Sequence, residues 1–169
     1  MTTPIEARFD LVDHDGTPVT ERTYRGCWPL VFFGFTHCRA VCPRALRRLS
    51  DVLDALGPGA GELQPLYITV DPARDTPAVM RTFLERDYPR FTGLTGSEAQ
   101  VTAAKAAFRV FARRKDDPDD PDGYAVPHTA ITYLLSPRGE YADHFTDALS
   151  AEEVTARLQR HSLVRKLSE

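Results

Sequence analysis

The stretch WPLVFFGFTHCRAVCPRALRRL, residues 28–49, joins an apolar run to a helical pattern, with two cysteines at the junction. Trp28–Phe35 is short, apolar and rich in β-forming residues, which predicts a buried central strand. Apolar residues recur at helical spacing from Cys42 to Leu56, and Gly57-Pro58-Gly59 then ends the pattern. A buried strand that leads into an amphipathic helix predicts a layered α/β sheet.

Further strands and helices follow on both sides of this unit. We expect a hairpin of Phe9–Val12 with Pro18–Thr23, strands at Leu63–Val70, Thr129–Leu135 and Glu140–Phe145, and helices capped by Thr76, Ser97 and Ser150. This order predicts a thioredoxin-like α/β fold, with a central mixed sheet flanked by helices and an N-terminal β-hairpin. Residues 115–123, KDDPDDPDG, predict a solvated acidic loop inside one domain that spans residues 1–169.

Composition excludes several classes of function. The net charge of −3 gives no reason to expect binding to nucleic acid or to an anionic membrane. The longest apolar run, Trp28–Phe35, is far shorter than the roughly 20 residues of a membrane-spanning helix. The first residues, MTTPIEARFDL, lack the pattern of a signal peptide. We therefore expect a cytoplasmic monomer, or an anchored extracytoplasmic protein if an N-terminal segment has been removed.

Cys38 and Cys42 lie four residues apart where the central strand passes into its helix. One helical turn rises about 6 Å, a Cα separation that a disulfide can span. The helix N-terminus and Arg39 favour the thiolate, which is both a nucleophile and a soft metal ligand. A disulfide, a redox couple and a metal site are therefore all compatible with this pair. The spacing is CxxxC, which differs from the CxxC of thioredoxins.

A metal held by two thiolates alone would be under-coordinated, so we looked for a third ligand among the five histidines. His128 is the best candidate, because it starts the strand that a thioredoxin-like fold places beside the cysteine-bearing helix. His37 adjoins Cys38, but the side chains of neighbouring residues point in different directions. His14 and His161 are expected on the surface, and His144 in a structural role.

Four segments resemble the SCO/SenC family in sequence and in order. FFGFTHCRAVCP, residues 32–43, is similar to its TxCxxxCP motif, and VDPARDTP, residues 70–77, to its DPxRDTP segment. FTGLTG at 91–96 and HTAITYLLSPRGEY at 128–141 also look like family sequence. The resemblance covers nearly the whole chain, about residues 9–161.

The resemblance implies a thioredoxin-like fold and a copper site made of Cys38, Cys42 and His128. Members of the family deliver copper to the dinuclear copper centre of cytochrome c oxidase, or reduce the cysteines of that centre. Two thiolates and an imidazole suit Cu(I), with Cu(II) as a second state, and the same thiols can form a disulfide. The expected partner is the copper-centre subunit of the oxidase or another copper-transfer protein.

The alternative hypothesis is a thiol–disulfide oxidoreductase or a peroxidase-like enzyme. Cys38 and Cys42 would then be the catalytic dithiol, and His128 would be dispensable. The second motif contains Asp71, Arg74 and Asp75. These residues either support the ligands of the site or form a docking surface, or they only stabilise a turn capped by Thr76.

Two positions depart from the family pattern. Pro127 stands directly before His128, where the family usually has an acidic residue that would orient the imidazole. Cys27 stands where the family usually has lysine, and its thiol is expected to be half-buried or to compete as a ligand.

Overall fold

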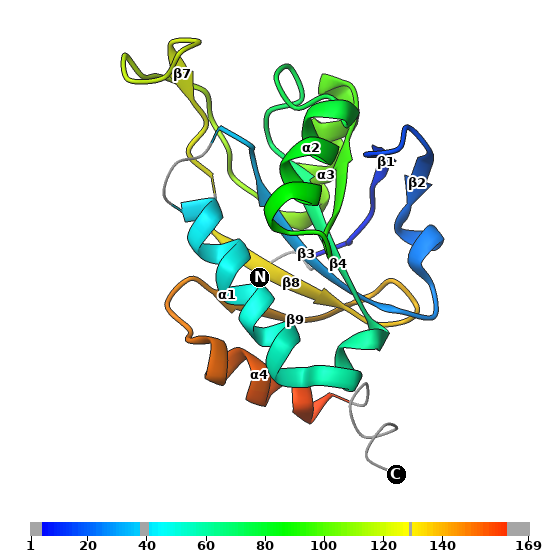
Figure 1. Ribbon diagram of the computed structural model, residues 1–169. Coiled ribbons are helices and arrows are strands. Elements are labelled where there is room, and N and C mark those ends of the chain that lie inside the picture. The colour runs from blue at the N-terminus through cyan, green and yellow to red at the C-terminus, as the bar shows by residue number, and fades with distance from the viewer. Residues whose placement is uncertain (1–4, 38–40, 129, 162–169) are drawn as a thin grey trace, which may run out of the picture.

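The computed structural model describes residues 5–37, 41–128 and 130–161. Its main helices lie around one extended sheet, and a small separate hairpin stands above the N-terminal end of α1 (Figure 1). The helices are α1 (Val41–Leu56), α2 (Pro77–Asp87), α3 (Glu98–Phe108) and α4 (Ala151–Arg160), with short 3-10 turns at Glu21–Tyr24 and Gly57–Glu62. The strands are β1 (Asp10–Asp13), β2 (Pro18–Thr20), β3 (Trp28–Gly34), β4 (Leu63–Thr69), β5 (Thr92–Thr95), β6 (Lys115–Asp116), β7 (Tyr124–Ala125), β8 (Ile131–Leu135) and β9 (Tyr141–Thr146).

The main sheet has the strand order β2-β1-β5-β4-β3-β8-β9. Strand β4 pairs in parallel with β3 and with β5, whereas β1, β8 and β9 run antiparallel to their neighbours. This is a mixed sheet flanked by helices, which confirms the predicted fold. The N-terminal hairpin is confirmed by the antiparallel pairing of β1 with β2.

Strand β5 is the one strand of the main sheet that the sequence pattern did not predict. Its four residues, TGLT, contain one large apolar side chain and show no clear alternation. Gly93 has a packing role, because a Cβ there would lie 3.0 Å from Leu84 and 3.1 Å from Met80 of α2. Helix α2 packs so close to the sheet here that glycine is favoured at position 93, and this preference comes from tertiary packing.

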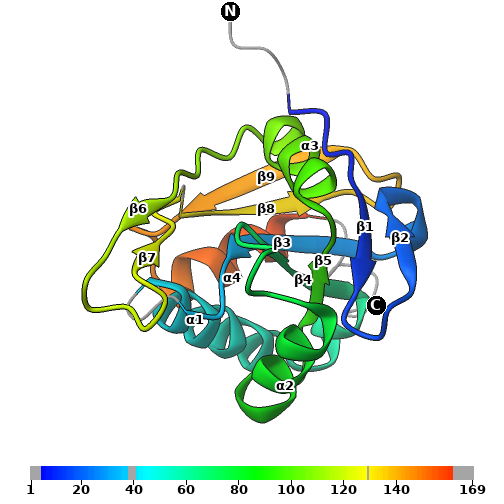
Figure 2. The ribbon, with the colours of Figure 1, turned by 90° about the horizontal axis from the view of Figure 1, so that it is seen from above.

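The sheet separates two hydrophobic cores. One face packs against α1, α2 and α4, and the other against α3, as the view from above shows (Figure 2). Strand β3 is buried along its whole length and contributes to both cores, with Phe32 in one and Phe33 in the other. This burial fixes the C-terminal end of β3 and the start of α1, where the cysteine motif lies.

Helix starts follow the predicted caps. The side chains of Thr76, Ser97 and Ser150 each accept a hydrogen bond from a backbone N–H of the first helical turn. On α2, Met80 and Leu84 are fully buried, whereas Val79 is exposed. In the described part of the chain, no helix is long and apolar enough to cross a membrane.

Candidate metal centre

Cys42 lies in the first turn of α1 and is completely buried. Its sulfur approaches the backbone of Gly34 so closely that a Cβ at that position would lie 2.7 Å from Sγ. The same Cβ would lie 2.7 Å from the Tyr67 hydroxyl, so glycine at position 34 makes room for both groups. Strand β3 and helix α1 therefore fix the position of the Cys42 sulfur from two sides.

His128 faces this sulfur from a segment far along the chain. Its Nε2 lies 3.8 Å from Cys42 Sγ, and its Nδ1 lies 3.1 Å from the carbonyl oxygen of Val126. A carbonyl oxygen only accepts, so Nδ1–H donates to Val126 and the lone pair of the neutral ring sits on Nε2. The ring thus presents the nitrogen that carries its lone pair to the cysteine sulfur.

Two aromatic rings hold the imidazole edge-on. Phe35 and Phe32 contact it with ring centroids 5.8 and 6.4 Å away and interplanar angles of 76° and 69°. Both phenylalanines are at least 95% buried, so the inner side of the ring is shielded from water. The outer side of His128 is partly exposed, which leaves a route by which an ion can enter or leave.

The distance between sulfur and nitrogen fits a shared metal ion. Bonds of about 2.3 Å to a thiolate and about 2.0 Å to an imidazole, meeting at a tetrahedral or trigonal angle, hold the two atoms roughly 3.5–3.7 Å apart. The observed 3.8 Å needs almost no adjustment. A thiolate with an imidazole is a soft donor set, which suits Cu(I) and zinc and is poor for Mg²⁺ or Ca²⁺.

The structure thus brings together two of the three predicted ligands. The third, Cys38, lies outside the described residues, so its predicted roles as ligand and redox partner stay predictions. Within the described ranges, no three His, Cys, Asp or Glu side chains form a group that could hold a metal ion.

The other histidines have structural partners. His37 Nδ1 lies 3.3 Å from Thr36 Oγ1, and His161 Nε2 is 3.2 Å from Asp143 Oδ2. His144 Nδ1 hydrogen-bonds to a tyrosine hydroxyl, and His14 Nδ1 accepts from a backbone N–H of β5.

The DPxRDTP-like segment anchors the chain directly before Cys38. The carboxylate of Asp75, fully buried, accepts hydrogen bonds from the N–H of Thr36 at 3.0 Å, from its hydroxyl at 2.5 Å, and from the hydroxyl of Thr69 at 2.7 Å. Burial raises the pKa of Asp75, and the hydrogen bonds from Thr36 and Thr69 oppose that rise. Asp75 thus positions Thr36, two residues before Cys38, which favours a role in supporting the site over a stabilised turn alone.

Arg74 of the same segment holds the acidic loop in place. Its guanidinium pairs with Asp71 at 2.5 Å and with Asp120 at 2.8 Å, and all three side chains are at least 92% buried. It also lies 3.9 Å from the centre of the Tyr124 ring, whose hydroxyl donates to Asp71 at 3.1 Å. These contacts connect a segment after β4 to a hairpin about 50 residues later.

Residues 115–123 are largely exposed, as expected of a solvated acidic loop, but the segment is also attached to the body of the protein. Strands β6 and β7 pair around it, and Asp120, in a stretch with no apolar residue, is 6% exposed. The physical reason is charge neutralisation by Arg74, because a buried carboxylate is tolerated when it is paired and hydrogen-bonded. The hairpin leads directly to His128 and so helps to place that ligand.

Cys27 is half-buried, which was one of the two expectations for this residue. It lies at the opposite end of β3 from Gly34. Seven residues of strand separate the two positions by about 23 Å. Cys27 therefore does not reach the Cys42 sulfur as a competing ligand.

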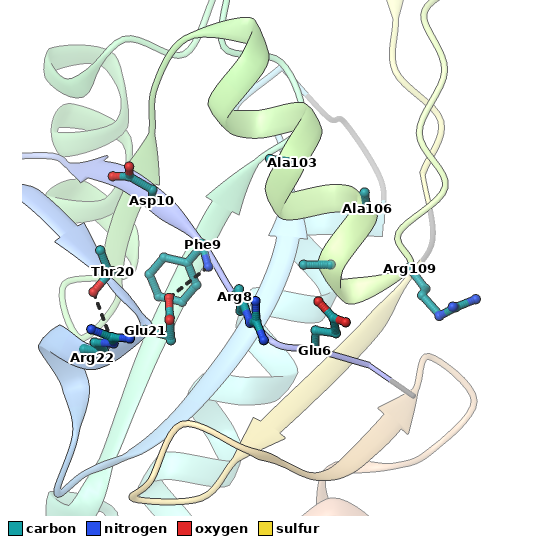
Figure 3. A pocket seen from close by; sticks show the side chains of 11 residues that line it. Glu6, Arg8, Phe9, Asp10, Thr20, Glu21, Arg22, Ala103, Ala106 and Arg109 are labelled. Carbon is teal, nitrogen blue, oxygen red and sulfur yellow. Dashed lines mark hydrogen bonds between the residues drawn. The ribbon is translucent and has the colours of Figure 1, made fainter. Parts of the chain in front are cut away.

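A separate hollow of about 750 Å³ opens between α3 and the N-terminal segment. Figure 3 shows its mixed charges, with Glu6, Arg8 and Arg109 around an apolar wall formed by Phe9 and the alanines of α3. No cysteine or histidine is among the residues that line it. It therefore has no part in the metal centre.

Comparison with known proteins agrees with this arrangement. The model of the SCO1/SenC family matches residues 1–162. "Protein SCO2 homolog, mitochondrial" from Bos taurus is 42% identical over 155 residues, and the alignment covers 90% of this chain and 58% of that protein. The human protein of the same name is 39% identical, again with 58% of its length covered. The chain thus spans somewhat more than half the length of these relatives.

Two solved structures are similar over nearly their whole length. The crystal structure of Arabidopsis thaliana ScoI with copper bound has a TM-score of 0.88 and 29% identity, covering 96% of this chain and 99% of that one. Bradyrhizobium japonicum ScoI with copper bound has a TM-score of 0.82 and 37% identity, covering 92% and 98%.

Proposed function

We propose a function from one established premise, that this chain belongs to the SCO1/SenC family. The chain acts as a copper-binding metallochaperone, which takes up copper through two cysteines and one histidine and passes it to a copper-containing protein. Copper is its cargo. The recipient that the family resemblance implies is the copper-centre subunit of cytochrome c oxidase, or another copper-transfer protein.

One observation carries the proposal: Cys42 Sγ and His128 Nε2 face each other at 3.8 Å, with the other ring nitrogen already bound to a carbonyl. In the metal-free protein the Cys42 thiol can donate to the lone pair of Nε2, and loss of that proton leaves both atoms able to bind one ion. The copper bound in the two similar ScoI structures supports copper as the cargo here. We propose Cys38 as the third ligand, because it lies four residues before Cys42 in the family motif.

The surroundings of Cys42 favour both binding and release. The positive end of the α1 dipole stabilises a thiolate, which is the form that binds Cu(I). A site of two thiolates and one imidazole holds Cu(I) by soft ligands that a recipient can replace one at a time. His128, as the partly exposed ligand, is the natural first group to be exchanged. After release, Cys38 and Cys42 can be oxidised to a disulfide by an acceptor of two electrons.

The test is a titration of the reduced protein with Cu(I) against a competing chelator. We expect one copper ion per chain, with affinity lowered at least about 100-fold in Cys38→Ser, Cys42→Ser and His128→Ala. The matched control is Cys27→Ser, which removes a thiol about 23 Å along β3 from the site and should leave the affinity unchanged.

The same variants separate this function from dithiol catalysis. If Cu(I) binds weakly, or binds equally well in His128→Ala, the metallochaperone proposal is wrong. A disulfide-reductase or peroxidase activity that needs both Cys38 and Cys42 but not His128 would then replace it.

A further inference from the structure

A basic rim borders the metal centre on the open side of His128. We define it as Phe111, Arg113, Arg114 and Lys115, all of which line a hollow of about 800 Å³ together with His128. The three cationic side chains are exposed, and Phe111 is 73% exposed, the largest value among the exposed large hydrophobic residues described. The rim therefore places positive charge and an apolar ring next to the exposed ligand.

The backbone ties this rim to the ligand segment. Ala112 forms a β-bridge with His128, and the N–H of Arg113 donates to the carbonyl of Pro127 at 3.1 Å. The guanidinium of Arg114 lies 3.9 Å from the centre of the Tyr124 ring, which limits its motion. The rim and His128 thus move as one unit, and a molecule that contacts the rim is held beside the ligand.

The charge of the rim opposes that of the whole chain, which is −3. Asp116 is the one carboxylate among the residues that line the hollow. Further along the hairpin, Asp120 and Asp122 are paired with Arg74 at 2.8 and 3.4 Å. The acidic residues nearest to the site are therefore partly neutralised from within, while the cations of the rim face outward.

We propose that the basic rim is the docking surface for an acidic face of the protein that receives copper. This inference rests on the proposed function. Exchange of copper requires the recipient's ligands to come within bonding distance of the ion, so the surface beside His128 becomes part of the interface. Complementary charge raises the rate of such encounters and orients them. The recipient accordingly carries carboxylates around its copper ligands, and Phe111 provides an apolar contact.

The experiment uses two synthetic acceptor peptides that contain the same Cys and His copper ligands. One is flanked by four glutamates and the other by four lysines, and their Cu(I) affinities are matched beforehand. Stopped-flow transfer from the copper-loaded protein should be about ten times faster to the glutamate peptide at low salt. The ratio of the two transfer rates, glutamate peptide to lysine peptide, should fall toward one near 1 M salt, where the Debye length is about 3 Å.

Charge reversal tests whether the rim causes the preference. The double variant Arg113→Glu, Lys115→Glu keeps the Arg114–Tyr124 contact, so it should bind copper as the parent does but prefer the lysine peptide. The matched control, Arg22→Glu, Arg138→Glu, changes net charge equally at exposed positions near the other end of β3 and should keep the original preference. The proposal is overturned if the ratio of transfer rates to the two peptides is unchanged in the rim variant, or if it changes equally in the rim variant and the control.

A copper-independent measurement separates failure of docking from failure of the proposed function. In ¹H–¹⁵N spectra of the reduced, metal-free protein, the metal-free glutamate peptide should shift the amides of residues 111–116 and 128 and leave those of residues 22–27 unchanged. Shifts elsewhere, or none, overturn the docking proposal even if copper binds. Binding of the rim to vesicles of phosphatidylserine and phosphatidylcholine, with no preference between peptides, would also overturn it in favour of a membrane surface.

Discussion

The two described ligands of the proposed copper site lie on halves of the molecule that are built in different ways. Cys42 belongs to the β3–α1 unit, where apolar side chains from both faces of the sheet fix the backbone. His128 follows the β6–β7 hairpin, which is attached to the body through Arg74, a single β-bridge, the Phe32 and Phe35 rings and the buried side chain of Val126.

This difference separates a rigid half of the site from an adjustable one. Hydrophobic burial has little dependence on salt and no preferred direction, so the Cys42 half should remain in place under most conditions. The His128 half combines the burial of Val126 with ion pairs and cation–π contacts, whose strength changes when a single charge is removed. Such an arrangement suits a carrier, because one ligand keeps the ion while the other can be exchanged.

The largest effect on stability and copper affinity is expected from Arg74→Ala, which removes the main charged contact of the His128 half. Removal of the guanidinium leaves the buried carboxylate of Asp71 without its counter-charge, and breaking a buried pair costs about 3 kcal/mol. Urea unfolding should show this loss, and Cu(I) affinity should fall because His128 is less well positioned. Arg81→Ala is the control, since Arg81 makes its ion pairs at the surface. Equal behaviour of the two variants would contradict the division into halves.

Gly34→Ala changes the packing of the Cys42 half. The added methyl group would lie 2.7 Å from Cys42 Sγ and from the Tyr67 ring, and overpacking of this kind costs about 1–3 kcal/mol. We expect lower stability in urea together with weaker copper binding, because the sulfur is displaced. Gly61→Ala provides the comparison, as nothing lies within 4 Å of its Cβ position. If Gly34→Ala binds copper normally, the sulfur is less tightly held than the packing indicates.

Asp75→Asn tests the anchor between the halves, and its effect depends on pH. Burial raises the pKa of Asp75 in the folded protein above its ordinary value of 3.8. The folded state then holds the proton more tightly, so this contribution to stability is complete below pH 3.8 and decreases as pH rises through the folded-state pKa.

The difference in unfolding free energy between the parent and Asp75→Asn should therefore decrease as pH increases from 3.8. Urea unfolding at a series of pH values measures it. A difference that grows with pH would mean that the hydrogen bonds from Thr36 and Thr69 outweigh burial.

The smallest effect is expected from Tyr124→Phe. It removes the hydroxyl that donates to Asp71 at 3.1 Å but keeps the ring beside Arg74 and Arg114. The loss of one such hydrogen bond costs about 0.5–1.5 kcal/mol. Tyr124→Leu removes the ring as well and should cost more and expose the amide of His128 to faster hydrogen exchange. Identical exchange in both variants would show that the ring does not help to hold the hairpin.

The same division explains what the sequence could predict. The strand Trp28–Gly34 was found from a continuous apolar run and the helix that follows from its 3.6-residue period, and both patterns are local. The pairing of Cys42 with His128 was predicted through the fold, and the structure places their side chains 3.8 Å apart.

The hairpin at 115–125 could not be found in the same way. Its composition is that of a solvated loop, and its order comes from Arg74, more than 40 residues earlier in the chain. Strand β5 was missed for a related reason, since Gly93 is required by contact with α2 and its own strand propensity is low. Where tertiary partners decide the local structure, a pattern read along the chain does not contain the answer.

The hydrogen bond from His128 Nδ1 to the carbonyl of Val126 has a consequence for how this protein can evolve. A carboxylate in that role, as the family usually has before its histidine, can be lost through a single codon change. A main-chain carbonyl is present whatever the side chain, so substitution cannot delete it. The orientation of the imidazole therefore depends on the path of the backbone and not on the identity of a neighbouring side chain. Exposed residues of the hairpin can therefore change, and with them the choice of partner, while His128 keeps the same nitrogen turned toward Cys42.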